Sequence, residues 1–557
     1  MKTILKNITI KGIFALILLL PAACTLNENP EIYRSADNYY KSKEECEVAV
    51  KGMYAAAQWI YKSNFLELVE LPTDYARTTK TNEQKNSSLA LYQYNAQHTS
   101  ILGFYRDAFA AINRFNNVIR NLEKVSFLSD TDKNRMLGEA RFLRGLHYLN
   151  LVRVFGELPV TLSETLESST VTYPKWNNEK IFKEAILPDL TFAEQNLPFD
   201  AFEAHRASGA AAKALLARTY QWLASCGKYG VMYHQWVADQ NLVTEYTDSV
   251  KSKCEPILNN VKYGLYPDFY DVWLYDYKVS KNTVVENIFA INFEYDNSEG
   301  NAYGAWFHSY YGSAAPGWDL TPGRAPVCLG QGYSGMAPTK EFWQMINSNP
   351  YDKRDTTMFT LRHGGTTKKV AFDAAGGASN PSNTTGGAAD MNSGVDFGIV
   401  KYRFQKGLET SAAGSAQIPV MRYADVLLMY AEACGHTDPK GVSALEQVRK
   451  RAYKKSDYSI SANDPADIVS AEAFEEAILK ERKIELCFEM SRWFDMVRTH
   501  TLGSTIRDLK MMYNMANGVQ LLNMSDYFDD ENKRMFFPLP SRTLELNRGL
   551  EQNNPWK

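Results

Sequence analysis

Apolar residues recur at helical spacing from Ala36 to about Ala224. In "EARFLRGLHYLNLVRVFGELP" one helix face would hold Leu143, Leu146, Leu149, Val152 and Phe155. Apolar positions three or four residues apart are the signature of an amphipathic helix. The pattern stops at Gly156 with Pro159 beyond, which is typical of a helix end. The spacing therefore predicts a helical N-terminal part.

Three helical segments share a small residue beside Leu and Tyr. They are "GLHY" at 145–148, the run at 210–220 and "RYADVLLMYAEA" at 422–433. Small residues let helix axes approach closely, as in tetratricopeptide pairs, although the spacing is too irregular for a strict repeat of about 34 residues. We interpret these segments as degenerate helical hairpins.

The middle of the chain lacks this pattern. Between Tyr263 and Gly398 the periodicity breaks down, Gly, Pro, Ser and Asn accumulate, and one short β-like run, "ENIFAINFEY", occurs. Loops on a rigid frame often carry binding residues. An aromatic group within this region comprises Tyr303, Trp306, Tyr310, Tyr311 and Trp318. Helical pattern resumes at Gln417, and the Pro-rich end predicts an extended tail laid back on the body.

The N-terminus resembles a secretory signal. A positive region with Lys2, Lys6 and Lys11 precedes the apolar run "IFALILLL", which is too short to span a bilayer. "LPAAC" then resembles a bacterial lipobox, although Pro21 stands where that motif usually has an aliphatic residue. We expect cleavage after residue 23 and acylation of Cys24. The alternative is an ordinary signal peptide cut near Ala23 that leaves Cys24 as a free thiol.

Composition mainly argues against certain classes of function. The 61 basic residues nearly balance the 64 acidic ones, so no global field would attract nucleic acid. The six cysteines other than Cys24 show no CxxC spacing, and we expect mostly buried thiols. The eight histidines are scattered without an i,i+4 pair. The sequence therefore predicts no metal site of the usual kinds.

Catalytic and cofactor motifs are also missing. A G-x-G-x-x-G at Gly330, Gly332 and Gly335 lacks the strand and helix that a dinucleotide site needs, with Pro326 before it and Pro338 after it. No GxSxG, HExxH or Walker-type sequence occurs. We expect neither a cofactor nor an enzyme.

The remaining catalytic candidate is "ERKIELCFEMSRWFDMVRT" at 481–499. On one helix, a single stripe would hold Glu481, Glu485, Glu489 and Arg492. Two such carboxylates meet the spacing of a glycosidase pair. Yet acids and bases balance in this stretch, and the i,i+3 pairs Glu489–Arg492 and Asp495–Arg498 favour an ion-pair lattice. Because a buried carboxylate must be paired, we predict a structural role, with partners such as Arg422 or Arg449.

Eight segments, in order along nearly the whole chain, carry a resemblance to a known family. They are "NPEIYRSADNYYKSKEECEVAVKGMYAAAQ", "EARFLRGLHYLNLVRVFGELPV", "SGAAAKALLARTYQW", "ENIFAINF", "APTKEFWQMI" with Asp352 and Arg354, "IPVMRYADVLLMYAEA", "ERKIELCFEMSRWFDMVR" and "FFPLPSRTLELNRGLEQNNPW". The chain resembles the SusD/RagB family of nutrient-binding outer-membrane lipoproteins of Bacteroidetes, with Met490 where a glycine is common.

The resemblance implies a mostly α fold, in which four tetratricopeptide-like helical pairs support a loop-rich half with little β. We expect a signal peptide at 1–23 and one domain at 24–557. Its parts would be a helical part at 24–230, a loop-rich ligand-facing part at 231–416, and a helical part with an extended tail at 417–557. Family members lie lipid-anchored on the cell surface over a SusC-like TonB-dependent transporter. They bind oligosaccharides, or in some cases peptides, without chemistry.

A sugar site needs flat aromatic faces beside polar groups that bind hydroxyls. The family often places ligand contacts in two loops, which here are 70–95 and 301–319. The candidate glycan-binding residues are Asp74, Arg77, Tyr92, Trp306, Tyr310 and Trp318. The alternative for each aromatic residue is packing inside the protein or against the transporter.

Several functions fit these observations. The first is a surface glycan-binding subunit of an uptake complex, and the second is a peptide or glycopeptide binder in the same setting. The third is an interaction scaffold or adhesin without a small ligand. A surface hydrolase is disfavoured by the missing motifs.

Overall fold

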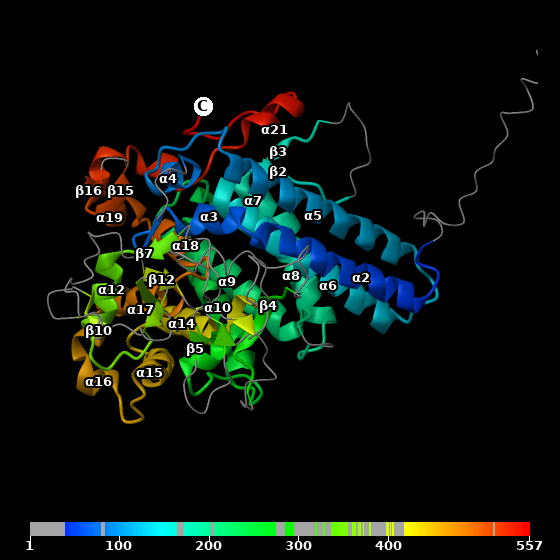
Figure 1. Cartoon of the computed structure of the whole chain (residues 1–557). Coiled ribbons are helices and arrows are strands. Elements are labelled where there is room, and N and C mark those ends of the chain that lie inside the picture. The colour runs from blue at the N-terminus through cyan, green and yellow to red at the C-terminus, as the bar shows by residue number, and fades with distance from the viewer. Residues whose placement is uncertain are drawn as a thin grey trace, which may run out of the picture. The chain divides into compact units, whose positions relative to one another are not determined.

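The computed structural model describes residues 39–78, 84–163, 172–201, 205–273, 284–293, 336–354, 417–515 and 518–557, and short stretches between 318 and 405. Residues 48–557 form one compact unit, shown in Figure 1. The predicted signal peptide and Cys24 lie outside the described residues. No helix in the described ranges is long and apolar enough to cross a membrane.

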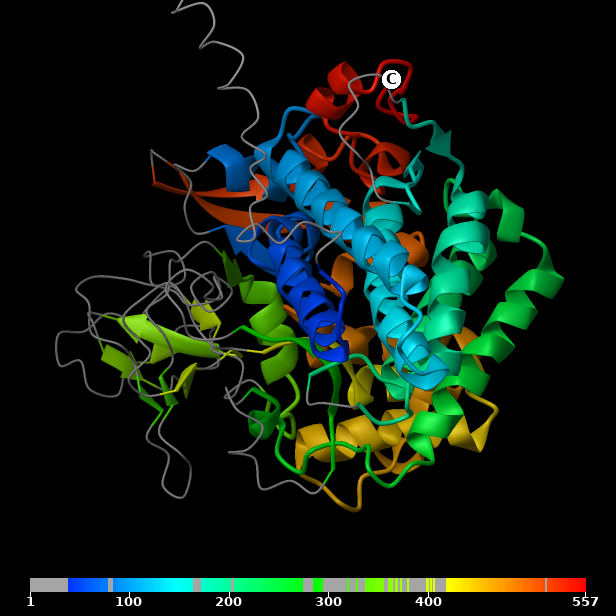
Figure 2. The ribbon, with the colours of Figure 1, turned by 90° about the vertical axis from the view of Figure 1, so that its right-hand side faces the viewer.

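The main helices of the unit are α5 (Thr99–Lys124), α6 (Asp130–Phe155), α8 (Leu187–Asn196), α9 (Gly209–Lys228), α10 (Gln240–Leu258), α14 (Tyr423–Cys434) and α15 (Pro439–Tyr453). Each packs against the next along the chain, and Figures 1 and 2 show them side by side. This succession confirms the predicted helical hairpins, because stacked helical pairs contact mainly their neighbours.

A small residue allows the close approach of α6 and α8. A Cβ on Gly145 would lie 2.8 Å from Leu190 Cδ2. The structure also ends α6 where the sequence predicted, since Gly156 adopts a φ of 77° and donates its N–H to the Val152 carbonyl at 2.8 Å.

Helix α6 departs from a simple amphipathic pattern. It is buried on every side from Arg135 to Phe155. Its polar residues find internal partners: Arg144 makes a bidentate pair with Asp189 at 2.7 and 2.8 Å. At Arg144 the polar side of α6 therefore packs against α8 instead of facing solvent.

The remaining helices are shorter or lie towards the two ends of the chain. They are α2 (Lys43–Ala57), α3 (Asn64–Glu70), α4 (Gln84–Ala90), α7 (Asn178–Ile181), α12 (Lys340–Asn347), α16 (Ile460–Asn463), α17 (Ala471–Glu485), α18 (Arg492–Arg498), α19 (Leu502–Arg507), α20 (Glu531–Arg534) and α21 (Ser541–Leu546).

The strands are short and pair in small antiparallel groups. The pairs are β1 (Ala76–Thr78) with β7 (Met336–Pro338), β2 (Leu158–Pro159) with β3 (Lys175–Trp176), β4 (Asn287–Ile291) with β14 (Ile418–Arg422), β10 (Ala371–Phe372) with β11 (Ala378–Ser379), and β15 (Lys510–Met515) with β16 (Gly518–Asn523). Two three-stranded groups join β5 (Trp318–Asp319), β6 (Val327–Cys328) and β13 (Phe404–Gln405), and β8 (Phe359–His363), β9 (Thr366–Lys368) and β12 (Phe397–Ile399). The predicted β-like run forms β4, and the mostly helical fold class is confirmed.

The C-terminal tail lies along the end of α6. Phe537 N–H donates to the Val154 carbonyl at 2.8 Å, and the Asn553 amide donates to the carbonyls of Phe155 and Glu157 at 2.7 Å each. The predicted return of the tail onto the body is confirmed, although the tail also contains the short helix α21.

Candidate ligand-binding site

One strand pair joins the first candidate loop to the segment that precedes α12. Strand β1 belongs to the loop at 70–95, whereas β7 follows the loop at 301–319 and directly precedes α12. Their antiparallel register sets Arg77 opposite Ala337. The first candidate loop therefore shares one hydrogen-bonded ladder with the segment before α12, which follows the second candidate loop along the chain.

Thr339 and Tyr75 fix this ladder to the body. Thr339 N–H donates to the Tyr75 carbonyl at 2.7 Å, while its hydroxyl caps α12 by accepting from Phe342 N–H at 3.3 Å. The Tyr75 ring packs against Phe342 and Phe488, with centroid distances of 5.1 and 4.7 Å. A buried aromatic cluster thus supports the β1–β7 ladder.

Asp74 lies beneath this base with its carboxylate turned inward. Arg492 donates to both of its oxygens at 2.9 and 2.8 Å, and Lys483 Nζ lies 2.8 Å away. Burial would raise the pKa of Asp74, but the charges of Arg492 and Lys483 outweigh it and hold the pKa well below its usual range. These contacts give Asp74 a positioning role in the first loop.

Tyr92 also has an internal partner. Its side chain is buried, and its hydroxyl donates to the Pro72 carbonyl at 2.5 Å. The contact closes the loop that carries Arg77 back on itself.

The other candidate residues lie mostly outside the described residues. Trp306 and Tyr310 are among them, whereas the backbone of Trp318 belongs to β5 and pairs with Cys328 of β6. The Arg77 side chain is likewise not described.

The charged stretch at 481–499 is not one helix, which corrects the predicted stripe. Helix α17 ends at Glu485 and α18 begins at Arg492, with a turn between them in which Phe488 and Met490 have φ angles of 58° and 59°. Met490 N–H donates to Glu70 Oε1 at 2.5 Å. The left-handed backbone favours glycine at this position, which gives a physical reason for the glycine that resembling chains often carry where this chain has Met490.

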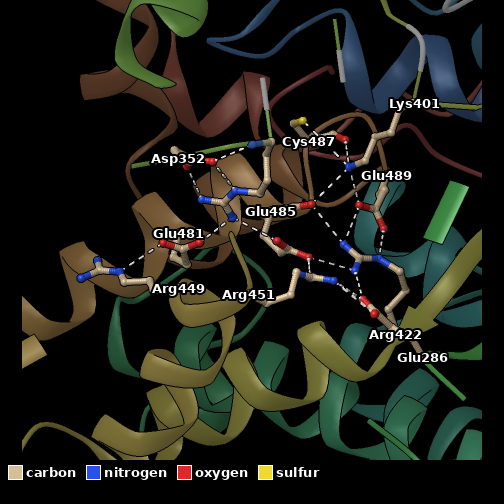
Figure 3. Close-up of polar contacts among 11 residues, drawn as sticks. Glu286, Asp352, Lys401, Arg422, Arg449, Arg451, Glu481, Glu485, Cys487 and Glu489 are labelled. Carbon is tan, nitrogen blue, oxygen red and sulfur yellow. Dashed lines mark hydrogen bonds and ion pairs between the residues drawn. The ribbon is translucent and has the colours of Figure 1, made fainter. Parts of the chain in front are cut away.

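The residues Glu481, Glu485 and Asp495 of this stretch are buried. Figure 3 shows the polar contacts of Glu481, Glu485 and Glu489. Glu485 accepts hydrogen bonds from Arg451 at 2.5 Å and from Arg422 and Arg354 at 3.0 Å each. Burial would raise its pKa, but these guanidinium charges outweigh it and hold the pKa well below the usual range. A permanently charged carboxylate with this many donors serves structure and is poorly suited to general acid catalysis.

Most of the predicted ion pairs form. Arg449 bonds to Glu481 at 3.2 Å, and Arg498 bonds to Asp495 at 2.9 Å. The predicted pair Glu489–Arg492 is wrong: Arg492 turns to Asp74, and Glu489 bonds to Lys401 and Arg422, each at 2.6 Å. The break in the helix separates Glu489 from Arg492, and each instead bonds to partners from distant segments of the chain.

Sequence reasoning missed several members of this cluster. They are Glu286, Lys401 and Arg451, and the pairing of Arg354 with Asp352 and Glu481. The sequence offered only a partial signal for these residues. The segments at 286–293 and 336–354 resemble the family, but nothing in them indicated which ion pairs form.

Glu70 differs from Asp74 and Glu485, whose pKa values are lowered. Burial raises the pKa of Glu70 to about 8. It accepts hydrogen bonds from the Tyr75 hydroxyl and Met490 N–H, and so touches both the loop base and the turn before α18. The folded protein therefore holds a proton on Glu70 at pH values where the unfolded chain has lost it.

This proton predicts a stability loss on raising the pH. A raised carboxyl pKa stabilises the fold fully below the ordinary value of 4.5, and this contribution disappears as the pH rises through about 8. We expect the parent to lose free energy of unfolding relative to Glu70→Gln between pH 4.5 and about 8, by up to about 1.4 kcal/mol per pH unit. Denaturant unfolding at several pH values measures it, with Glu545→Gln as the exposed control. Parallel pH profiles for parent and Glu70→Gln would contradict this assignment.

The described cysteines are free thiols, and the described residues hold no metal-binding group. Cys46, Cys226, Cys254 and Cys487 are buried free thiols and Cys434 is a partly exposed one, as expected for most of them. The described residues contain no group of His, Cys, Asp and Glu that could hold a metal ion.

Comparison with known proteins identifies the family. A family model described as "SusD family" matches residues 285–556, and one described as "Starch-binding associating with outer membrane" matches residues 30–221. The chain belongs to the SusD/RagB family, whose members are non-catalytic binding proteins.

Three similar proteins illustrate the match. "SusD-like protein P2" of Formosa agariphila is 25% identical, over 97% of this chain and 98% of its own length. The crystal structure of a SusD homolog from Bacteroides thetaiotaomicron has a TM-score of 0.72 at 22% identity, covering 94% of this chain and 98% of that one. The surface glycan-binding protein A from Bacteroides fluxus has a TM-score of 0.66 at 18% identity, covering 92% and 99%. The likeness in fold thus spans nearly the whole chain.

Proposed function

We propose that this protein captures oligosaccharides at the cell surface and delivers them to a SusC-like TonB-dependent transporter. The family membership supports a binding role at the outer membrane, and the second family description includes starch binding. One structural relative is named a surface glycan-binding protein. Lipid on Cys24 would hold the protein at the membrane.

The observation that carries a binding site is the β1–β7 ladder. It ties the loop with Arg77 to the segment before α12. A binding site gains affinity when its loops are held in place before the ligand arrives. The aromatic cluster of Tyr75, Phe342 and Phe488 supplies that support from below.

The proposed site has two kinds of residue. Trp306, Tyr310 and Trp318 supply flat faces for the apolar side of a sugar ring, and Arg77 donates to hydroxyl groups. Asp74 and Tyr92 set the shape of the first loop, since the side chains of both already bond to internal partners.

A binding screen tests the class of ligand. Protein lacking residues 1–24 is applied to a glycan array and to a peptide library under the same conditions. We expect binding to one related group of glycans and none to the peptides. Binding to peptides alone would replace glycan capture with peptide capture, and binding to neither would favour a scaffold without a small ligand.

A further inference from the structure

A small, partly open cavity lies among α6, α9, α17 and α18. Its volume is about 30 Å³, and its lining includes four guanidinium groups, those of Arg153, Arg218, Arg482 and Arg498. A cavity needs roughly 10–15 Å³ of such volume to hold one water. The space therefore suits a water molecule or a monatomic ion.

Carboxylates neutralise three of these arginines. Asp425 bonds to Arg218 at 2.6 Å and Arg482 at 2.7 Å. Asp495 bonds to Arg482 and Arg498 at 2.9 Å each. Glu432 pairs with Arg498 at 2.5 Å. These acids are shared among Arg218, Arg482 and Arg498, and none of their bonds reaches Arg153.

Glu489 also lines the cavity, but its charge is used elsewhere. Its two oxygens bond to Lys401 and Arg422, each at 2.6 Å. These partners belong to the neighbouring buried cluster around Glu485. Glu489 therefore supplies no direct bond to the arginines of the cavity.

Arg153 is the arginine of this cavity without a direct ion pair among the described residues. Its residue is only 5% exposed. Nε donates to the Leu149 carbonyl at 3.3 Å and Nη2 to Asn150 Oδ1 at 2.6 Å, while the guanidinium lies 3.9 Å from the Phe494 ring centroid. Within the described part of the chain, Nη1 makes no hydrogen bond to a protein acceptor and no carboxylate forms an ion pair with the guanidinium, although Asp425 and Asp495 act on it from farther away.

Such a group is costly to bury. An uncompensated internal charge costs several kcal/mol, and an aromatic face offsets only part of it. Burial, together with the nearby charge of Arg218, lowers the pKa of Arg153 to about 9, and the charges of Asp425 and Asp495 offset only part of this shift. A water in the cavity would satisfy the hydrogen bond but would leave the guanidinium without a direct counter-ion.

We propose that this cavity binds one small monovalent anion, such as chloride, which accepts a hydrogen bond from Arg153 Nη1 and supplies a direct counter-charge. A halide needs only positive donors in a small space, which the cavity offers. Arg153 comes from α6 and Arg482 and Arg498 from α17 and α18. The bound anion therefore links the N-terminal helices to the C-terminal ones, and the stability of the fold depends on it.

Thermal unfolding of the full-length protein in detergent tests this link. The probes are sodium chloride, bromide and gluconate at equal ionic strength and pH. We expect the halides to raise the unfolding midpoint saturably by about 1–3 °C over gluconate. Arg153→Gln removes the difference, whereas Arg542→Gln, an exposed arginine, keeps it. Equal midpoints of the parent in halide and gluconate would overturn the proposal.

Crystals grown in bromide give an independent readout that needs no variant. We expect one anomalous peak in the cavity, within hydrogen-bond distance of Arg153 Nη1. If Arg153→Gln fails to fold, this peak in the parent alone supports the site. A cavity that holds only water in bromide would refute it.

Discussion

Replacing Glu485 by glutamine lowers the free energy of unfolding by about 3–5 kcal/mol. Its carboxylate bonds to Arg451, Arg422 and Arg354, and all four side chains are buried. The amide keeps the shape but removes the negative charge, so these arginines lose a shared counter-charge that water cannot replace. Denaturant unfolding measures the change through the midpoint, or as a loss of soluble yield if the variant does not fold.

The matched control is Glu545→Gln. Glu545 is exposed and pairs only with exposed Arg542 at 3.0 Å, so its removal changes stability by less than about 1 kcal/mol. We expect folded Glu485→Gln to keep the ligand affinity of the parent. A variant of full stability that loses ligand would return the stretch at 481–499 to the functional candidates.

If Cys24 carries the proposed lipid anchor, we expect Cys24→Ala to release the protein from the outer membrane. Each buried CH₂ of an acyl chain contributes about 0.8 kcal/mol, and two or three chains together hold a protein firmly. Without the lipid, only the transporter contact would retain it. Membrane fractionation followed by a high-salt wash compares the parent with Cys24→Ala, using the partly exposed thiol variant Cys434→Ala as the control.

The outcomes of this fractionation are distinct. The parent and Cys434→Ala stay with the outer membrane, and Cys24→Ala appears in the soluble fraction. Cys24→Ala that pellets with the membrane after the wash would argue against the lipid anchor.

Local patterns predicted the helices well. The end of α6 at Gly156 and the packing of successive helices follow from residues close in sequence. The pairing of Glu485 with Arg422 was also foreseeable, because a balanced charged stretch on a buried helix requires partners.

Long-range contacts explain what the sequence could not predict. The break between α17 and α18 places Phe488 N–H on the Tyr75 hydroxyl at 3.0 Å, across 413 residues. Helical spacing of the apolar residues continues through this break, so periodicity alone predicts one helix. A partner so far along the chain leaves no local signal.

The same limit applies to the candidate site. Asp74 stands in a polar loop segment, and such residues usually face solvent. Its bonds to Arg492 span 418 residues and bury it instead. The sequence therefore proposed the first loop as a candidate, but not that its Asp74 turns inward.

The most direct test of glycan capture is a calorimetric titration with the best glycan from the array. The parent is compared with the double variant Trp306→Ala, Trp318→Ala and with Trp176→Ala, a partly exposed tryptophan outside the proposed site. We expect the double variant to lose affinity by about tenfold or more, since sugar rings lose their stacking faces, and Trp176→Ala to match the parent. Equal affinity in the parent and the double variant would contradict the proposed site, and an array on which the parent binds no glycan would contradict glycan capture itself.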